Sequence, residues 1–243
     1  MAPSDERRRA ELVAALGSVR SRIAEACQGA GRDAQSVTMI AVTKTYPASD
    51  VAALAELGVT DVGESRDQQA RAKVAELAGS PYPGLELRWH LIGRLQTNKA
   101  RSVVSYAHAV HSVDRSELAT ALADAAARAD RAHPLAVFIQ VSLDGDPDRG
   151  GVIADGVAAL AEWVATRSEL ALAGVMAVAP RAAEPDAAFT ALREVSVQLQ
   201  REHPQADAIS AGMSADLEAA IRNGSTHVRV GTALLGRRPT VFG

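Results

Sequence analysis

Short apolar runs alternate with stretches of helical periodicity along almost the whole chain. Eight runs have the length and composition of β-strands, and Ala/Leu/Glu/Arg-rich segments separate them. The predicted strands are 37–43, 60–63, 88–92, 107–112, 135–142, 170–178, 207–210 and 227–230. The predicted helices are 48–57, 65–78, 96–104, 115–131, 153–167, 184–202 and 214–223. An amphipathic helix over 5–28 precedes them, with Leu12, Leu16, Val19 and Ile23 at helical spacing.

This alternation predicts an α/β protein of the closed (β/α)8 TIM-barrel type. Strand–helix repeats form right-handed units on a parallel sheet, and eight of them in 243 residues match a barrel of about 250. The alternative, an open doubly wound sheet, lacks a glycine-rich dinucleotide fingerprint after the first strand. No linker divides the chain, so we expect residues 1–243 to form a single barrel domain, with residues 1–30 as an extra helix packed on it.

The charge, hydropathy and cysteine content of the chain limit the kinds of partner and location that we expect. The net charge of −3 does not support binding to nucleic acid. No apolar run approaches the ~18 residues of a membrane span, so no membrane partner is expected. The lone Cys27 rules out an intramolecular disulfide and fits a reducing, cytoplasmic location.

The segment AVTKTYP, residues 41–47, places Lys44 directly after the first strand. A lysine at a strand end is ordinarily a solvent contact. In a barrel, however, functional groups lie at the carboxyl ends of the strands. Lys44 is therefore a candidate functional residue.

The loop after the seventh strand reads Gly212-Met213-Ser214. Ser214 is a good N-cap for a helix over 214–223, and Gly212 allows a ligand to approach the backbone closely. The loops after strands seven and eight are the usual phosphate site of this fold.

The eighth strand ends in Arg229-Val230-Gly231-Thr232. Alternation places Val228 and Val230 on one face and Arg229 on the other. Gly231 and Thr232 offer backbone N–H groups and a hydroxyl to an anion. Ser214 as a simple cap and Arg229 as a surface charge remain the alternatives for each residue taken alone.

A lysine beside a phosphate site suggests a bound phosphorylated aldehyde. A lysine amine condenses with an aldehyde only as the free base, and burial or a nearby cation such as Arg229 lowers its pKa. Pyridoxal 5'-phosphate (PLP) fits, and so does a phosphosugar that forms a Schiff base in a lyase. A lyase needs a carboxylate near Lys44, for which Glu64 is the candidate.

No metal site is predicted. His108 and His111 lie three apart on a strand and are expected to point to opposite faces. The acidic loop 144–148 lacks the glycine and glutamate of a calcium loop. His90, within WHLIG on the third strand, is as readily a core or ring-adjacent residue as a catalytic one. The basic patch 96–101 is most simply a helix start, and a second anion site there stays open.

Several motifs resemble the pyridoxal phosphate homeostasis protein family, whose members are related to the barrel domain of bacterial alanine racemase. The matching motifs, in family order over residues 41–238, are AVTKTYP, GESRDQQARAK, WHLIGRLQTNKAR, HSVDR, FIQVSLDGDPDRGGV, LAGVMAVAP and GMSADLEAAIRNGSTHVRVGTALLGRR.

The resemblance implies a PLP site with roles for individual residues. It implies a Schiff-base lysine at Lys44, phosphate contacts from Ser214, Gly231 and Thr232, and Arg229 facing the pyridine nitrogen. The predicted cofactor-binding residues are Lys44, Ser214, Arg229, Gly231, Thr232, Met213, Gly212, Ser65 and His90. Ser65 stands where the family usually has asparagine, and Arg94 stands where it often has histidine, so the ring-oxygen contact of the asparagine is in question.

The resemblance also implies a function. Arginine cannot accept a proton, so Arg229 leaves the pyridine nitrogen mostly unprotonated and makes the ring a weaker electron sink. The sequence ends at Gly243, and the second domain that supplies the other base of alanine racemase is not expected. We therefore predict a PLP-binding homeostasis protein that stores or delivers the cofactor without established catalysis. The alternative is a PLP-dependent amino-acid racemase or other Schiff-base enzyme. PLP-dependent apo-enzymes are possible partners, and a monomer or weak dimer is expected.

Overall fold

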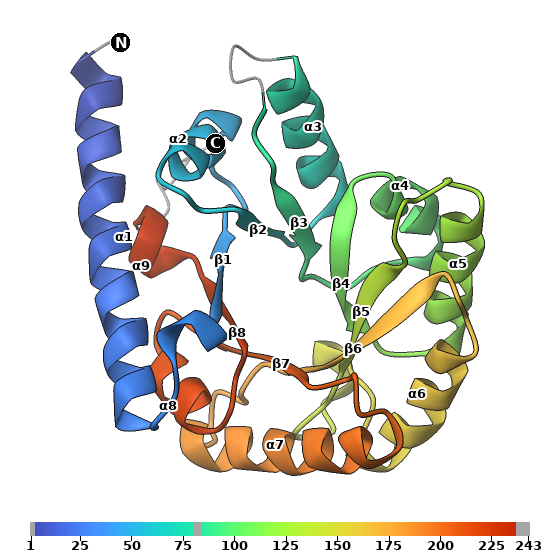
Figure 1. Ribbon diagram of the computed structural model, residues 1–243. Helices are drawn as coiled ribbons and strands as arrows, with labels where there is room; N and C mark the ends of the chain where they lie inside the picture. The colour runs from blue at the N-terminus through green and yellow to red at the C-terminus, as the bar shows by residue number, and fades with distance from the viewer. Residues whose placement is uncertain (1–2, 80–83, 237–243) are drawn as a thin grey trace.

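Eight parallel strands close into a barrel with helices around it (Figure 1). The computed structural model describes residues 3–79 and 84–236. Each strand pairs with its neighbours in sequence, and β1 pairs with β8 to complete the ring. The strands are β1 Thr38–Val42, β2 Asp61–Glu64, β3 Arg88–Leu91, β4 Ala107–Val113, β5 Leu135–Gln140, β6 Leu170–Met176, β7 Ala208–Met213 and β8 His227–Val230. The eight predicted strands and the barrel are confirmed.

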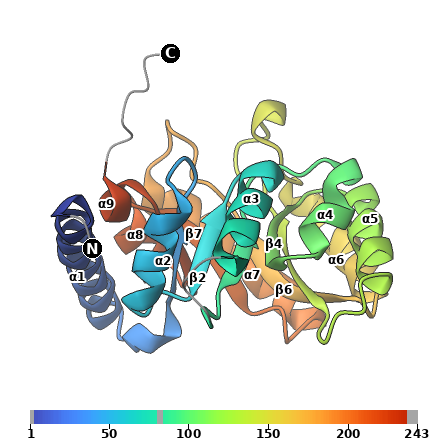
Figure 2. The ribbon, with the colours of Figure 1, turned by 90° about the horizontal axis from the view of Figure 1, so that it is seen from above.

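Helices cover the outside of the barrel (Figure 2). They are α1 Pro3–Gly29, α2 Ala48–Glu56, α3 Asp67–Ala78, α4 Ala100–Val104, α5 Ser116–Ala127, α6 Val157–Ala165, α7 Pro185–Glu202, α8 Leu217–Arg222 and α9 Thr232–Leu235. Short 3₁₀ segments lie at Ala34–Ser36, Thr97–Lys99, Pro147–Arg149 and Ala154–Gly156. The predicted helices are present, while the short α9 was not predicted.

Two predicted helix ends are wrong. Helix α5 stops before Asp130, which has φ 46° in the left-handed region. Helix α8 begins at Leu217, so Ser214 is not its N-cap. Residues 214–216 form a turn instead, in which the Asp216 carboxylate accepts a hydrogen bond from the Met213 N–H at 2.6 Å.

Helix α1 covers the β1/β8 side of the barrel, beside α8 and α9 (Figure 1). Its apolar face is fully enclosed: Leu12, Leu16, Val19 and Ile23 are 0–6% exposed. They belong to one apolar cluster with Val228 and Val230 on the outer face of β8. Helix α1 therefore contacts the outer face of β8, and Arg229, which alternates with these two valines, lies on the inner face.

Several polar side chains lie inside the barrel, beside apolar ones such as Phe138. His90, His111, Ser210 and Arg229 are all at most 4% exposed and point inward from four different strands. Among the described helices, none combines the length and the apolar character needed to cross a bilayer.

Candidate functional site

Strand pairing brings Lys44 beside the loop that follows β8. Ala41 pairs with Val230, so the residues after β1 lie alongside Gly231 and Thr232. A Cβ on Gly231 would lie 3.4 Å from the Val42 carbonyl oxygen, which shows how closely the two loops approach. Lys44 is half-buried at this end of the barrel.

The loop that carries Lys44 is held by its neighbours. Thr45, the next residue, has φ 74°, an uncommon conformation for a residue with a side chain. The Tyr46 hydroxyl donates to the carbonyl of Gly236, at the end of α9, at 2.7 Å. The turn after Lys44 is therefore fixed against the segment after β8.

Ser214 joins the loops after β7 and β8. Its hydroxyl oxygen accepts a hydrogen bond from the Ala233 N–H at 3.2 Å, and its carbonyl accepts one from Arg22 at 2.9 Å. Arg22 also pairs with Glu218 at 2.7 Å, so α1 braces this turn. The Ser214 hydroxyl thus links the loop after β7 to the segment after β8.

Gly212 is required by packing within the chain. Its φ is +89°, and a Cβ would lie 2.5 Å from the Cβ of Ala220 on α8. The close approach predicted for a ligand is thus made by a helix, and the predicted ligand contact remains a prediction. Met213, the next residue, is 40% exposed at the mouth.

Arg229 lies inside the barrel with only neutral acceptors. Its Nη1 donates to the carbonyl and hydroxyl oxygens of Ser210, both at 2.7 Å, and its Nη2 donates to the carbonyl of Ala177 at 2.8 Å. Burial lowers the pKa of Arg229 to about 10, which still leaves it a cation at neutral pH. In the part of the chain that the structure describes, its Nε–H and one Nη2–H have no hydrogen-bond partner.

Glu64 is engaged by two protein groups below Lys44. Its Oε1 accepts from Lys73 Nζ at 2.6 Å and from the Thr43 hydroxyl at 2.7 Å. Lys73 also donates to the Thr43 carbonyl at 2.7 Å. All three side chains are buried, and Glu64 Oε2 has no hydrogen-bond partner among the described residues.

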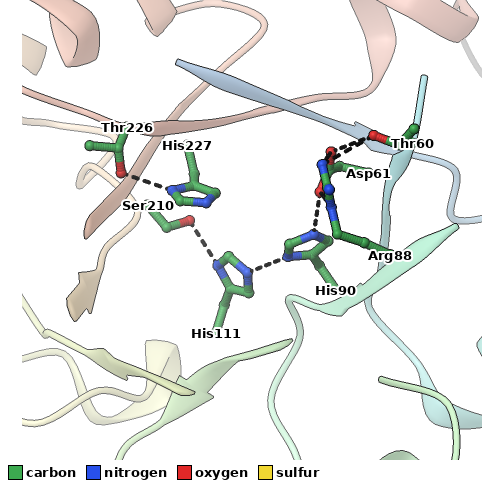
Figure 3. A network of polar contacts seen from close by, with 8 residues as sticks. All are labelled: Thr60, Asp61, Arg88, His90, His111, Ser210, Thr226 and His227. Carbon is green, nitrogen blue, oxygen red and sulfur yellow. Dashed lines mark hydrogen bonds and ion pairs between the residues drawn. The ribbon is translucent and has the colours of Figure 1, made fainter. Parts of the chain in front are cut away.

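A hydrogen-bonded chain crosses the barrel interior from Ser210 to Asp61 (Figure 3). His111 Nδ1 lies 2.9 Å from Ser210 Oγ, and His111 Nε2 lies 2.9 Å from His90 Nδ1. His90 Nε2 lies 2.9 Å from Asp61 Oδ1. Asp61, at the first residue of β2, also accepts from Arg88 at 2.6 and 2.8 Å.

The predicted opposite orientation of His108 and His111 is wrong. Both rings contact the His90 ring, with centroids 5.6 and 5.1 Å away. The pairing of β3 with β4 shifts register at His108, because the consecutive residues Trp89 and His90 pair with Ala107 and Ala109, and this irregularity breaks the strict alternation on which the prediction relied.

Burial sets the charge states in this interior. Desolvation, followed by the neighbouring His90 and Arg229, lowers the pKa of His111 well below its usual value, so this ring is neutral at neutral pH. Desolvation also lowers the pKa of His227 to about 4. Although burial alone would raise the pKa of Asp61, its hydrogen bonds from His90 and Arg88 lower it, so Asp61 is ionised.

Ser65 lies at the end of β2 against Gly93. A Cβ on Gly93 would lie 2.2 Å from the Ser65 carbonyl oxygen, so only glycine allows this contact. Beside Ser65, a depression of about 920 Å³ is lined by Arg94, Lys99 and Arg115. The predicted helix start at 96–101 is confirmed, and the second anion site stays a prediction.

The structure thus gathers most predicted site residues and separates one. Lys44, Ser65, Ser214, Gly231 and Thr232 follow the adjacent strands β7, β8, β1 and β2. Met213 ends β7, and Arg229 lies within β8. His90 is joined to Arg229 through His111 and Ser210. Arg237 and Arg238, the end of the last motif, lie outside the described residues.

Sequence reasoning missed Asp61, Lys73, His111 and Ser210. The alternation of side chains along a strand could have indicated some of the interior residues. It places His227 on the same face as Arg229, and Ser210 on the same face as Gly212. In the described residues, the only cluster with metal-ligand spacing is Glu162, Glu202 and His203, whose ligand atoms lie within 4.8 Å of one another. It belongs to α6 and the end of α7, outside the barrel, and the absence of a metal stays a prediction.

Comparisons with known proteins agree with this architecture. The family model described as alanine racemase, N-terminal domain, matches residues 16–239. A pyridoxal phosphate homeostasis protein of Mycobacterium leprae is 45% identical over 240 residues, covering 94% of this chain and 93% of that protein. A pyridoxal phosphate homeostasis protein of Escherichia coli is 37% identical over 226 residues, covering 92% of this chain and 95% of that protein.

A solved structure also matches nearly end to end. The PipY protein of Synechococcus elongatus, solved with PLP bound, superposes with a TM-score of 0.79 at 32% identity. The match covers 93% of this chain and all of PipY, 100%.

Proposed function

The chain belongs to the alanine racemase N-terminal domain family, and on that premise we propose that it binds PLP and acts in PLP homeostasis. Its relatives named for PLP homeostasis and the PLP-bound structure of PipY support this role. When bound, PLP supplies a phosphate and an aldehyde that condenses with a lysine amine.

The observation that carries the proposal is the place of Lys44 among the lysines. The sequence contains three lysines: Lys44, Lys73 and Lys99. Lys73 is committed to Glu64 and the Thr43 carbonyl, and Lys99 is exposed on the rim. Lys44 alone follows β1 next to the donors after β8. We assign Lys44 as the covalent attachment site.

The residues present suit the two ends of PLP. Ser214, Thr232 and the Gly231 backbone would bind the phosphate, since they bring hydroxyl and N–H donors to neighbouring loops. The two unused N–H groups of Arg229 would face the pyridine nitrogen, which is an acceptor. Met213 and Ser65 would line the mouth on either side.

Glu64 does not favour the alternative of a Schiff-base enzyme. A racemase or lyase needs a base that is free to take a proton near Lys44. The Glu64 carboxylate is instead held by Lys73 and Thr43. We therefore propose a binding protein without catalysis, located in the cytoplasm, that stores PLP or delivers it to apo-enzymes as a monomer or weak dimer.

The test is the visible absorption of the purified protein with added PLP, for wild type, Lys44→Ala and the matched control Lys99→Ala. We expect a protein-bound band in wild type and Lys99→Ala that Lys44→Ala loses. Borohydride reduction and peptide mapping should place the adduct on Lys44. A band in Lys44→Ala equal to that of wild type, or an adduct on Lys73 or Lys99, would contradict the assignment.

A further inference from the structure

A buried hydrogen-bonded chain joins Arg229 to Asp61 across the barrel interior. Figure 3 shows its part from Ser210 to Asp61. Its links are Ser210, His111 and His90, at heavy-atom distances of 2.7 to 2.9 Å. Each link comes from a different strand, and each residue of the chain is at most 6% exposed. These distances lie within the normal range for hydrogen bonds between nitrogen and oxygen atoms.

The carboxylate end determines where the protons lie. Ionised Asp61 accepts, so His90 carries its proton on Nε2 and presents an Nδ1 lone pair. His111 then donates from Nε2 and presents its own Nδ1 lone pair. The Ser210 hydroxyl is the donor to that lone pair, at 2.9 Å.

The arginine end requires the same direction. A guanidinium only donates, so Ser210 Oγ must accept from Arg229 and pass its single hydrogen onward. Its other neighbour within hydrogen-bond distance, in the described part of the chain, is His111. If His90 were protonated, the direction would reverse and leave this hydroxyl hydrogen without an acceptor. Both ends therefore specify one arrangement, with both histidines neutral.

The common direction of these hydrogen bonds stabilises Arg229, which is a buried cation. Its three acceptors are neutral oxygens, and no carboxylate lies within hydrogen-bond distance of it among the described residues. Each dipole in the chain points its negative end at the guanidinium and its positive end at Asp61. The chain stabilises both charges and holds Nη1 in place, leaving the unused N–H groups facing away from Ser210.

We propose that Asp61, His90, His111 and Ser210 are positioning residues that orient Arg229 toward the ring nitrogen of bound PLP. This inference rests on the proposed PLP site for its ligand, while the chain itself belongs to the protein without PLP. If Asp61 or His90 is replaced, the remaining histidine is no longer held in one tautomer. The Ser210 hydroxyl can then rotate away from its ordered position.

The first measurement uses protein without PLP. Nitrogen-15 shifts of the imidazole rings at neutral pH should show Nε2–H tautomers for both His90 and His111. In Ser210→Ala the His111 ring should lose this single tautomer. An Nδ1–H tautomer or a protonated ring at either position in wild type would overturn the chain, whatever PLP does.

The second measurement links the chain to the cofactor. We expect Ser210→Ala and His90→Gln to weaken PLP binding about fivefold, the usual worth of one hydrogen bond, and to shift the absorption maximum of bound PLP. Buried residues outside the barrel interior provide matched controls: Ser196→Ala and His203→Gln should change neither quantity. Circular dichroism and thermal unfolding would verify that all four variants are folded.

Two outcomes separate the inference from the proposed function. If wild type binds PLP and both chain variants bind it with unchanged affinity and spectrum, the positioning role is wrong while the PLP site stands. If wild type binds no PLP, the proposed function fails and the orientation of Arg229 toward PLP fails with it. In that case the imidazole tautomers would test only the direction of the hydrogen bonds between Ser210 and Asp61.

Discussion

Lys73 Nζ donates to Glu64 Oε1 at 2.6 Å, directly behind the residue that precedes Lys44. Both side chains are at least nine-tenths buried, and Lys73 also holds the Thr43 carbonyl. This pair therefore supports the turn that carries Lys44, from a helix and a strand that meet only in the folded barrel.

Removing one partner of this pair should be costly. We expect Glu64→Ala to lower the free energy of unfolding by about 3–5 kcal/mol, because it leaves the Lys73 ammonium buried without its anion. The double variant Glu64→Leu with Lys73→Met should lose less than the single one. Urea denaturation measures both. Arg7→Ala, at an exposed helix pair, is the control and should change stability by less than about 0.5 kcal/mol.

Gly93 should not tolerate even alanine. The added Cβ would lie 2.2 Å from the Ser65 carbonyl oxygen, so backbone must move at the end of β2. We expect a loss of more than about 2 kcal/mol, as for other overpacked sites. Gly17→Ala is the counterpart on α1, where nothing lies within 4 Å, and should stabilise by about 0.5–1 kcal/mol. Equal thermal shifts for the two variants would contradict this reading of the contact.

Stability should fall in acid below the ordinary pKa of histidine. Burial, followed by His90, lowers the pKa of His227 from 6.5 to about 4, so the unfolded chain binds a proton that the folded chain does not. The stability is present above pH 6.5 and is lost as pH falls toward 4, by up to about 3 kcal/mol from this group.

Asp61 adds a second acid transition. Its lowered pKa contributes stability that is present above the unfolded pKa of an aspartate and is lost at lower pH, as the folded carboxylate is protonated. Unfolding free energies from pH 7 to 3 for wild type and His227→Gln separate the two groups. The variant should lose less stability between pH 6.5 and 4, and an unchanged slope would contradict the lowered His227 pKa.

Helix α1 should contribute measurably through its buried face. Leu16 is 3% exposed against the β1/β8 side, and Leu16→Ala should cost about 2–5 kcal/mol. Val13 is 46% exposed on the same helix, so Val13→Ala should cost less than about 0.5 kcal/mol. Denaturant midpoints compare them. Similar midpoints for the two variants would contradict the docking of α1 on the barrel.

Ser214 should matter for PLP more than for folding. Losing a hydrogen bond to a charged phosphate weakens binding by about tenfold or more, which Ser214→Ala tests by fluorescence titration with PLP. Ser105→Ala removes an exposed hydroxyl that donates only to the carbonyl of Ser102 and should leave the affinity unchanged. Equal affinities for the two variants would remove Ser214 from the phosphate site.

The sequence by itself determined the barrel. Each strand and helix shows its own hydrophobic period, which reflects local propensity and which face of that element is buried, and the alternation of eight such pairs predicts the closed sheet. It also placed Lys44, Ser214, Gly231 and Thr232 at one mouth, since the ends of successive parallel strands share an edge. The tertiary structure decided the partners of these residues. Ser214 joins the loop after β8 instead of capping a helix, and Lys73 is drawn to Glu64.

The hydrogen-bonded chain from Ser210 to Asp61 was the feature least predictable from the sequence pattern. His111 and Ser210 are 99 residues apart, and their contact depends on barrel closure and on the register irregularity between Ala107 and Ala109 of β4. Alternation assigns a residue to a face, but it does not say which side chains meet across an enclosed interior. That depends on register, on the tilt of the strands and on the need of every buried donor and acceptor for a partner.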